Sequence, residues 1–273
     1  MKLNWLLPRV CYVGQAVLIL GSGCSPSLVM AVEGDAGKQA DKNTRYALIY
    51  DGPGSAEDAP QAVAQVARQA GLPIQYVSRV NDIPKSLPGA ALLAIGGTED
   101  DLEPLRKQFT PPIVAAIGQY LREGGIFVGF CGGGYLASQS YEDENGVVKC
   151  LGIVPATTDA LLDDATARIV PVRWKGTKRS VYYQAGPKFI LQDAPRGVEV
   201  IATYSDGSIA ALLCAYGKGK VCVSGPHPEA PDSWRNDIPG GAADWKACPE
   251  LATELIQDVL SDRVIGKATP SKP

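Results

Sequence analysis

The sequence predicts an α/β protein with a doubly wound, mostly parallel sheet and antiparallel strands in its second half. Three observations support this prediction. In the first half, short apolar runs alternate with amphipathic helical segments over brief connections, which is typical of a parallel sheet covered on both faces. The second half carries more strand-like than helical segments. With 273 residues, 45% of them apolar, the chain can bury the core of one large domain.

The elements of the first half follow from apolar periodicity and from the glycines and prolines between the apolar runs. Continuous apolar runs predict buried strands at residues 46–50, 74–77, 91–95 and 126–130. A helix is expected after Asp58, which can cap it, with Pro60 in its first turn and Gly71 at its end. Helical spacing of apolar residues predicts a second helix around residues 113–121.

The second half is expected to form antiparallel ribbons before it closes with a helix. Strand-like runs occur at Val198–Thr203, Ile209–Tyr216 and Lys220–Ser224. Leucines and a valine then recur at helical spacing between Leu251 and Leu260, which predicts an amphipathic helix at the end of the domain.

The first 31 residues are predicted to be a signal peptide or lipoprotein signal rather than part of the fold. They combine a positively charged start, a short apolar run and small residues. Two processing routes fit: cleavage after Ala31, or lipidation of Cys24. A tether (32–43), the main domain (44–262) and a flexible tail (263–273) are expected to follow. We therefore expect an exported protein, periplasmic or envelope-associated, with no integral membrane domain beyond the signal or lipid anchor.

Charge and cysteine content exclude several classes of protein. A net charge of -3 without a Lys/Arg cluster argues against a nucleic-acid binder. A single histidine argues against a zinc cluster, and we expect neither a metal nor a cofactor. The cysteines beyond the signal are odd in number, so at least one thiol stays unpaired in a monomer. Cys214 and Cys222 either pair across a hairpin or are small buried strand residues.

The segment Gly129–Gly134 has the G-x-C-x-G pattern of a nucleophile elbow. Because it follows an apolar strand and precedes a helical segment, Cys131 is expected on a sharp turn whose glycines relieve clashes. A helix amino terminus there stabilises a thiolate, and the Gly132 N–H faces a developing oxyanion. The alternatives are a buried structural cysteine or a phosphate-binding loop, although the Lys-Ser/Thr of such loops is missing.

His227 is the only histidine of the chain and directly follows a predicted strand. A cysteine nucleophile needs a base, and that base needs an orienting acceptor, which Glu229 can supply two residues further on. A lone histidine often has only a structural role. Here an elbow cysteine, a strand-end histidine and a nearby carboxylate coincide, which favours a Cys131–His227–Glu229 triad.

A few other residues are candidates for the site. Gly96 and Gly97 end the third strand near the elbow, and the Gly97 N–H is either a second oxyanion donor or part of a plain turn.

The remaining candidates each have a functional and a structural interpretation. Glu142 lies either in the pocket or in a solvated loop. Trp234 and Trp245 form either a lid or packing anchors, and Tyr182 and Tyr183 either a gate or part of the strand packing.

Together these motifs resemble class I glutamine amidotransferases. More closely, the chain is similar to the amino-terminal amidotransferase-like domain of biotin–protein ligases and its stand-alone bacterial relatives. The matching stretches are Tyr50–Gly54, Gly124–Cys131, Tyr182–Pro187, Tyr204–Gly207, Gly217–Lys220 and His227–Glu229.

This resemblance implies a flavodoxin-like fold and roles for individual residues. Cys131 would be the nucleophile, His227 the base, Glu229 its orienting group, and Gly97 and Gly132 the oxyanion donors. Amidotransferases of this class carry Gln four residues after the nucleophile, where this chain has Tyr135. Glutamine is therefore not the expected substrate.

The residues and the resemblance predict an exported, cysteine-dependent amidohydrolase-like protein. Its substrate is expected to be a carboxamide or a small peptide-like amide, cleaved through a thioester on Cys131. The alternative is a catalytically silent binding module in the cell envelope. The sequence leaves the individual substrate and the oligomeric state open.

Overall fold

The computed structural model describes residues 45–143, 145–192 and 196–265. The predicted signal peptide (1–31) with Cys24, the tether (32–43) and residues 266–273 of the predicted tail lie outside these ranges. Arg263 Nη1 donates to both carboxylate oxygens of Glu199 at 3.0 Å, and Ile265 is buried. The folded domain therefore continues past its predicted end at Asp262.

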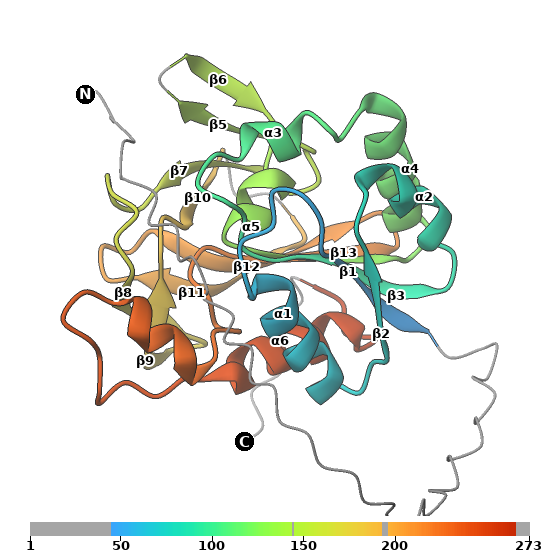
Figure 1. The fold of residues 1–273 in the computed structure, drawn as a ribbon. Coiled ribbons are helices and arrows are strands. Elements are labelled where there is room, and N and C mark those ends of the chain that lie inside the picture. The colour runs from blue at the N-terminus through green and yellow to red at the C-terminus, as the bar shows by residue number, and fades with distance from the viewer. Residues whose placement is uncertain (1–44, 144, 193–195, 266–273) are drawn as a thin grey trace, which may run out of the picture. The chain divides into compact units, whose positions relative to one another are not determined.

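A mixed sheet of 13 strands organises these residues (Figure 1). Its main path is β2-β1-β3-β4-β13-β12-β10-β7-β5-β6, and β11, β8 and β9 branch from β12. The first five strands of this path pair in parallel, and the later pairs are antiparallel except for β5 with β7. The strands are β1 (Tyr46–Tyr50), β2 (Ile74–Val77), β3 (Ala90–Ile95), β4 (Ile126–Phe130), β5 (Ser140–Asp143), β6 (Gly146–Lys149), β7 (Ala156–Ala160), β8 (Arg168–Trp174), β9 (Thr177–Tyr183), β10 (Pro187–Leu191), β11 (Val198–Tyr204), β12 (Ile209–Tyr216) and β13 (Gly219–Ser224).

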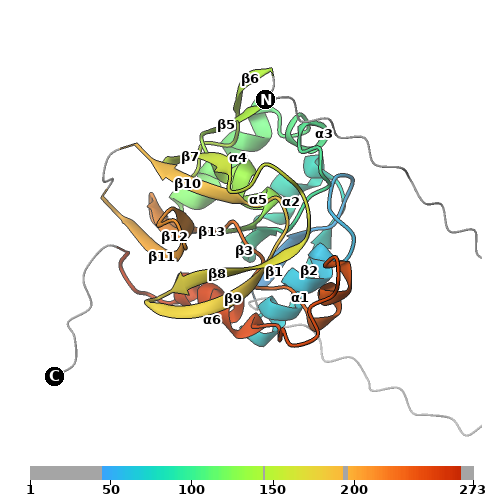
Figure 2. The same ribbon diagram turned by 90° about the vertical axis from the view of Figure 1, so that its left-hand side faces the viewer.

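Helices cover both faces of the parallel half (Figure 2). One face carries α1 (Ala59–Gln69) and α6 (Pro249–Leu260), and the other carries α2 (Ile83–Ser86), α3 (Glu103–Arg106), α4 (Pro111–Arg122) and α5 (Gly132–Ala137). Two short 3-10 helices complete the set, η1 (Val80–Asp82) and η2 (Asp232–Asp237). This arrangement confirms the predicted fold class. Within the described ranges, no helix has the length and apolar character needed to cross a membrane.

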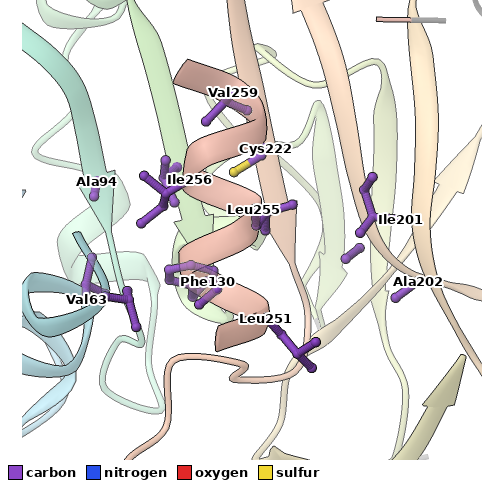
Figure 3. Packing of buried hydrophobic residues seen from close by; sticks show 14 of the residues in the cluster. Val63, Ala94, Phe130, Ile201, Ala202, Cys222, Leu251, Leu255, Ile256 and Val259 are labelled. Atoms are coloured by element: carbon purple, nitrogen blue, oxygen red, sulfur yellow. The ribbon is translucent and has the colours of Figure 1, made fainter. Parts of the chain in front are cut away.

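The core beneath α1 and α6 fixes the end of β4. Val63 of α1 and Leu255 and Ile256 of α6 belong to the same buried cluster as Phe130 of β4 and Cys222 of β13 (Figure 3). Full burial of such a side chain contributes about 1.5–3 kcal/mol. Because Phe130 is the last residue of β4, this packing holds the backbone immediately before the elbow.

Two local expectations are now decided. Asp58 precedes α1 but makes no capping hydrogen bond with its side chain, because its backbone is left-handed (φ 61°). That part of the helix prediction is wrong. Cys214 pairs with Val221 in the β12–β13 register and lies on the opposite face from Cys222, so the two are buried strand residues. All cysteines in the described part of the chain are free.

Two glycines allow α5 to begin in direct contact with the sheet. A Cβ on Gly133 would lie 2.1 Å from the carbonyl oxygen of Ile95, and one on Gly129 would lie 2.6 Å from that of Gly133. The N–H of Gly133 also donates to the carbonyl of Gly96 at 3.1 Å. The turn after β4 is therefore clamped against the end of β3 by backbone contacts.

Gly133→Ala is expected to destabilise the protein by about 1–3 kcal/mol, because the new methyl group meets a backbone carbonyl that cannot move without shifting β3. Gly118→Ala in α4 is the matched control. Its Cβ would make only ordinary contacts at 3.4 Å, and alanine favours the helix by about 0.5–1 kcal/mol. Urea denaturation measures both variants. Equal stability of Gly133→Ala and the wild type would show that the elbow tolerates a side chain at this position.

Candidate active site

Cys131 occupies a strained turn between β4 and α5. Its backbone has φ 50° and ψ -108°, in a region that residues other than glycine rarely adopt. The Cys131 N–H donates to the carbonyl of Ser224 at the end of β13 (2.8 Å). The N–H groups of Gly134 and Tyr135 return to the Cys131 carbonyl at 2.8 and 3.1 Å. The strand-to-helix turn expected from the sequence is therefore present.

His227 and Glu229 lie just beyond the end of β13, next to this turn. His227 Nδ1 and Glu229 Oε1 are 2.9 Å apart, and the two residues are only 5% and 2% exposed. The backbone N–H of His227 donates to the carbonyl of Tyr182 at 2.8 Å, which ties the segment to β9. The structure thus brings the two predicted partners together in a buried contact.

The side chain of Cys131 lies near enough to the imidazole of His227 to affect its pKa. Burial lowers the pKa of His227, but the charges of Cys131 and Glu229 and the hydrogen bond to Glu229 raise it further, to about 10 from an ordinary 6.5. The protonated imidazolium is therefore favoured at neutral pH. Such a site can hold a proton on the base and present sulfur as the nucleophile.

Two backbone donors lie beside the thiol and the imidazole. In the part of the chain that the structure describes, the N–H groups of Gly97 and Gly132 meet no protein acceptor. A Cβ on Gly97 would lie 3.1 Å from His227 Cε1, and one on Gly132 would lie 2.1 Å from Thr98 Oγ1. Gly96 differs from these two, because its carbonyl accepts from Gly133 and so anchors α5. The arrangement offers two free donors for an oxyanion.

A segment that the sequence analysis did not place in the site lies against the thiol. Residues 184–186 join β9 to β10, and we call these residues together with Pro187, the first residue of β10, the strap. Cys131 Sγ donates to the carbonyl oxygen of Gln184 at 3.4 Å, and Ala185 has a positive φ of 52°. A backbone carbonyl has no side-chain signature in a sequence. The one available signal was that Tyr182–Pro187 is among the stretches that carry the family resemblance.

Aromatic rings cover the imidazole on the side of β9. The ring centroids of Tyr182 and Trp234 lie 5.7 and 5.2 Å from that of His227. Trp245 packs on Tyr182 and donates from Nε1 to the carbonyl of Ser180 at 3.0 Å. Trp245 belongs to a small buried cluster and the partly buried Trp234 packs against it, so both act as packing anchors in this arrangement. Cys131 itself is only 9% exposed.

The remaining candidates lie outside this cluster. Glu142 is exposed on β5, in agreement with its interpretation as a solvated acidic residue. Among the residues with described positions, no group of three or more His, Cys, Asp or Glu side chains could hold a metal ion.

Comparison with known proteins places this geometry in context. Residues 46–153 and 160–257 match the family described as biotin-protein ligase, N terminal. A solved glutamine amidotransferase structure superposes with a TM-score of 0.50 and 17% identity, over 66% of this chain and 90% of its own. A cytoplasmic protein from Salmonella typhimurium LT2 gives a TM-score of 0.50 and 13% identity, over 78% of this chain and 99% of its own. A search of curated proteins finds no match. The structural likenesses show a glutamine amidotransferase-like fold.

The single histidine gives a direct test of the electrostatics. In a chain without a histidine tag, the one imidazole Cε1–H resonance is expected to titrate well above 6.5, toward the pKa of about 10. Glu229→Gln and Cys131→Ala should each lower the midpoint, because each removes a negative charge that favours the imidazolium. NMR titration measures all three chains. A wild-type midpoint near 6.5 that neither variant moves would contradict this account.

Proposed function

Because the chain belongs to the family of biotin–protein ligase amino-terminal domains, we propose that it is a cysteine-dependent amidohydrolase. Its glutamine amidotransferase-like fold supports a role in amide chemistry. The observation that carries the proposal is the buried His227–Glu229 contact next to the strained turn that holds Cys131. The proposed substrate is a carboxamide or a small peptide-like amide.

In the first half-reaction, His227 holds the proton of the Cys131 thiol as an imidazolium, and the sulfur attacks the amide carbonyl carbon. A C–S bond forms, and the carbonyl π electrons move to the oxygen, where the N–H groups of Gly97 and Gly132 stabilise the charge. Collapse of this intermediate breaks the C–N bond. The imidazolium of His227 gives its proton to the departing nitrogen, which leaves as ammonia or an amine.

In the second half-reaction, the same imidazole removes a proton from water. The resulting hydroxide attacks the thioester carbonyl, and collapse breaks the C–S bond to release a carboxylic acid and regenerate the thiol. Glu229 accepts from Nδ1 throughout, which fixes the ring orientation and stabilises the imidazolium that forms in each step.

The position four residues after Cys131 separates the proposed substrate from glutamine. Tyr135 stands there, and its hydroxyl donates to the carbonyl of Ala185 at 3.2 Å. The Tyr135 hydroxyl is therefore hydrogen-bonded to the strap. This position has no side-chain amide that could bind a ligand as the Gln of amidotransferases does. We also propose that the protein acts after export, on the basis of the predicted signal in residues 1–31; fractionation of cells that express the full chain tests this part.

A second function is favoured by the closure of the site. Because Cys131 and His227 are 9% and 5% exposed, the site must open before a substrate reaches the sulfur. A binding module that retained the fold without turnover would have the same closed site. Reactivity of the thiol and product release separate the two functions.

Cys131 is expected to react with methyl methanethiosulfonate at pH 6 faster than the other thiols. Burial raises the pKa of Cys150 and of Cys248 to about 11, so these residues are internal controls. His227→Ala should slow the reaction of Cys131 on the order of 100-fold, and Glu229→Gln should slow it less, because the base remains. Mass spectrometry of quenched samples measures the rates. Equally slow reaction of all thiols would favour the binding module.

Turnover is tested by release of ammonia from a panel of primary carboxamides. The wild-type chain is expected to release ammonia from at least one member, and Cys131→Ser should abolish this activity while the protein stays folded. Release that persists in Cys131→Ser would exclude the thioester route.

A further inference from the structure

The thiol of Cys131 has hydrogen-bonding groups of opposite kind around it. The N–H groups of Gly97 and Gly132 are free donors, whereas the carbonyl oxygen of Gln184 is an acceptor 3.4 Å from the sulfur. An acyl carbon that approaches the sulfur stands about 3–3.5 Å from it before the bond forms. The substituents on that carbon therefore come within hydrogen-bonding range of these same groups.

The strap holds this carbonyl rigidly. Four buried or half-buried tyrosines donate hydroxyl hydrogen bonds to it: Tyr135 to the Ala185 carbonyl (3.2 Å), Tyr182 to Gln184 Oε1 (3.1 Å), Tyr183 to the Gly186 carbonyl (3.1 Å) and Tyr204 to the Pro187 carbonyl (2.9 Å). Burial raises the pKa of each of these hydroxyls, so each keeps its proton and remains a donor. Every residue of the strap is thus held by a tyrosine.

Backbone strain and close packing add to this rigidity. Ala185 keeps its positive φ of 52° although it is not glycine, a conformation that is sterically strained for a residue with a Cβ. A Cβ on Gly186 would lie 2.0 Å from the carbonyl oxygen of Gly225, and one on Gly225 would lie 1.9 Å from that of Pro187. The strap is therefore packed directly on the segment that leads to His227, and the acceptor keeps a fixed position relative to both sulfur and imidazole.

The proton movement of the proposed mechanism leaves this acceptor without a donor. The Gln184 carbonyl oxygen lies 3.4 Å from Cys131 Sγ and accepts from the thiol while the thiol is protonated. Once the thiol proton has moved to His227, the sulfur no longer donates. The N–H of an amide substrate can replace it, whereas an ester presents only oxygen lone pairs there and leaves the acceptor unpaired.

On this basis we propose that the Gln184 carbonyl is a specificity-determining group that accepts the substrate N–H, so that the site selects primary and secondary amides over esters and tertiary amides. The inference rests on the proposed cysteine-dependent hydrolysis and specifies its substrate class. Gln184 acts through its backbone, and Tyr135, which fixes the next carbonyl, is a positioning residue.

The test compares electrophiles that share the same reactive iodomethyl carbon and differ in whether the neighbouring carbonyl carries an N–H. Iodoacetamide, 2-iodo-N,N-dimethylacetamide and methyl iodoacetate are reacted with the full chain, and alkylation of Cys131 is followed by mass spectrometry. Each rate is divided by the rate of glutathione with the same reagent. Iodoacetamide is expected to show a normalised preference of about tenfold over the other two at Cys131. Cys150 and Cys248 should show no preference.

Tyr135→Phe should reduce this preference several-fold, because it frees the Ala185 carbonyl and lets the strap turn. Tyr46→Phe is the matched control, since its hydroxyl donates to the distant Ser86 carbonyl, and it should leave the preference unchanged. No preference at a rapidly reacting Cys131 would overturn the inference while leaving the proposed function intact. Equal acceleration of all three reagents in Tyr135→Phe would also overturn it, because the strap would then be only a cover. Slow reaction of Cys131 with methyl methanethiosulfonate would instead reject the proposed function.

Discussion

The parallel pairing of β4 with β13 is the constraint on which the candidate site depends. It sets Phe130 opposite Ser224, so the residues that follow each strand emerge at the same edge of the sheet. The next N–H along the chain, that of Cys131, then donates to the Ser224 carbonyl and locks the two strand ends together. Nearly one hundred residues separate the cysteine from His227 in the sequence, and this pairing brings the two segments that carry them side by side. The carboxyl edge of a parallel sheet is the usual place for such a meeting.

Much of the fold could be predicted because its central strands are continuous apolar runs. β1, β3 and β4 are buried along almost their whole length, and their sequences show this directly. β9 could not be predicted in the same way, since its first four residues are exposed and include Lys178 and Arg179. It is a strand because it pairs with β8, and that pairing is a property of the tertiary structure. The left-handed backbone of Asp58 likewise depends on the loop before it.

The candidate site shows a similar division. Cys131, His227 and Glu229 could be singled out as candidates from the sequence because a glycine-flanked cysteine and a single histidine are distinctive, and the family resemblance pointed to the same residues. Their mutual distances depended on strand order, which no local pattern determines. The role of the Gln184 carbonyl could not be predicted from the sequence, because every residue has a backbone carbonyl. The Gly97 and Gly132 N–H groups could be proposed from the glycines that mark their turns, whereas an acceptor such as the Gln184 carbonyl can be found only from coordinates.

The confinement of the imidazole has a consequence for the order of events in any turnover. His227 has Glu229 on its Nδ1 edge, the backbone of Gly97 near Cε1, and the rings of Tyr182 and Trp234 packed against it. An imidazole enclosed on so many sides cannot move between one position for the leaving nitrogen and another for the incoming water. Water must then enter the space that the departing amine has vacated, so the first product leaves before the second reactant binds. Such a double-displacement scheme also lets an added amine compete with water for the acylated sulfur and exchange one amide for another.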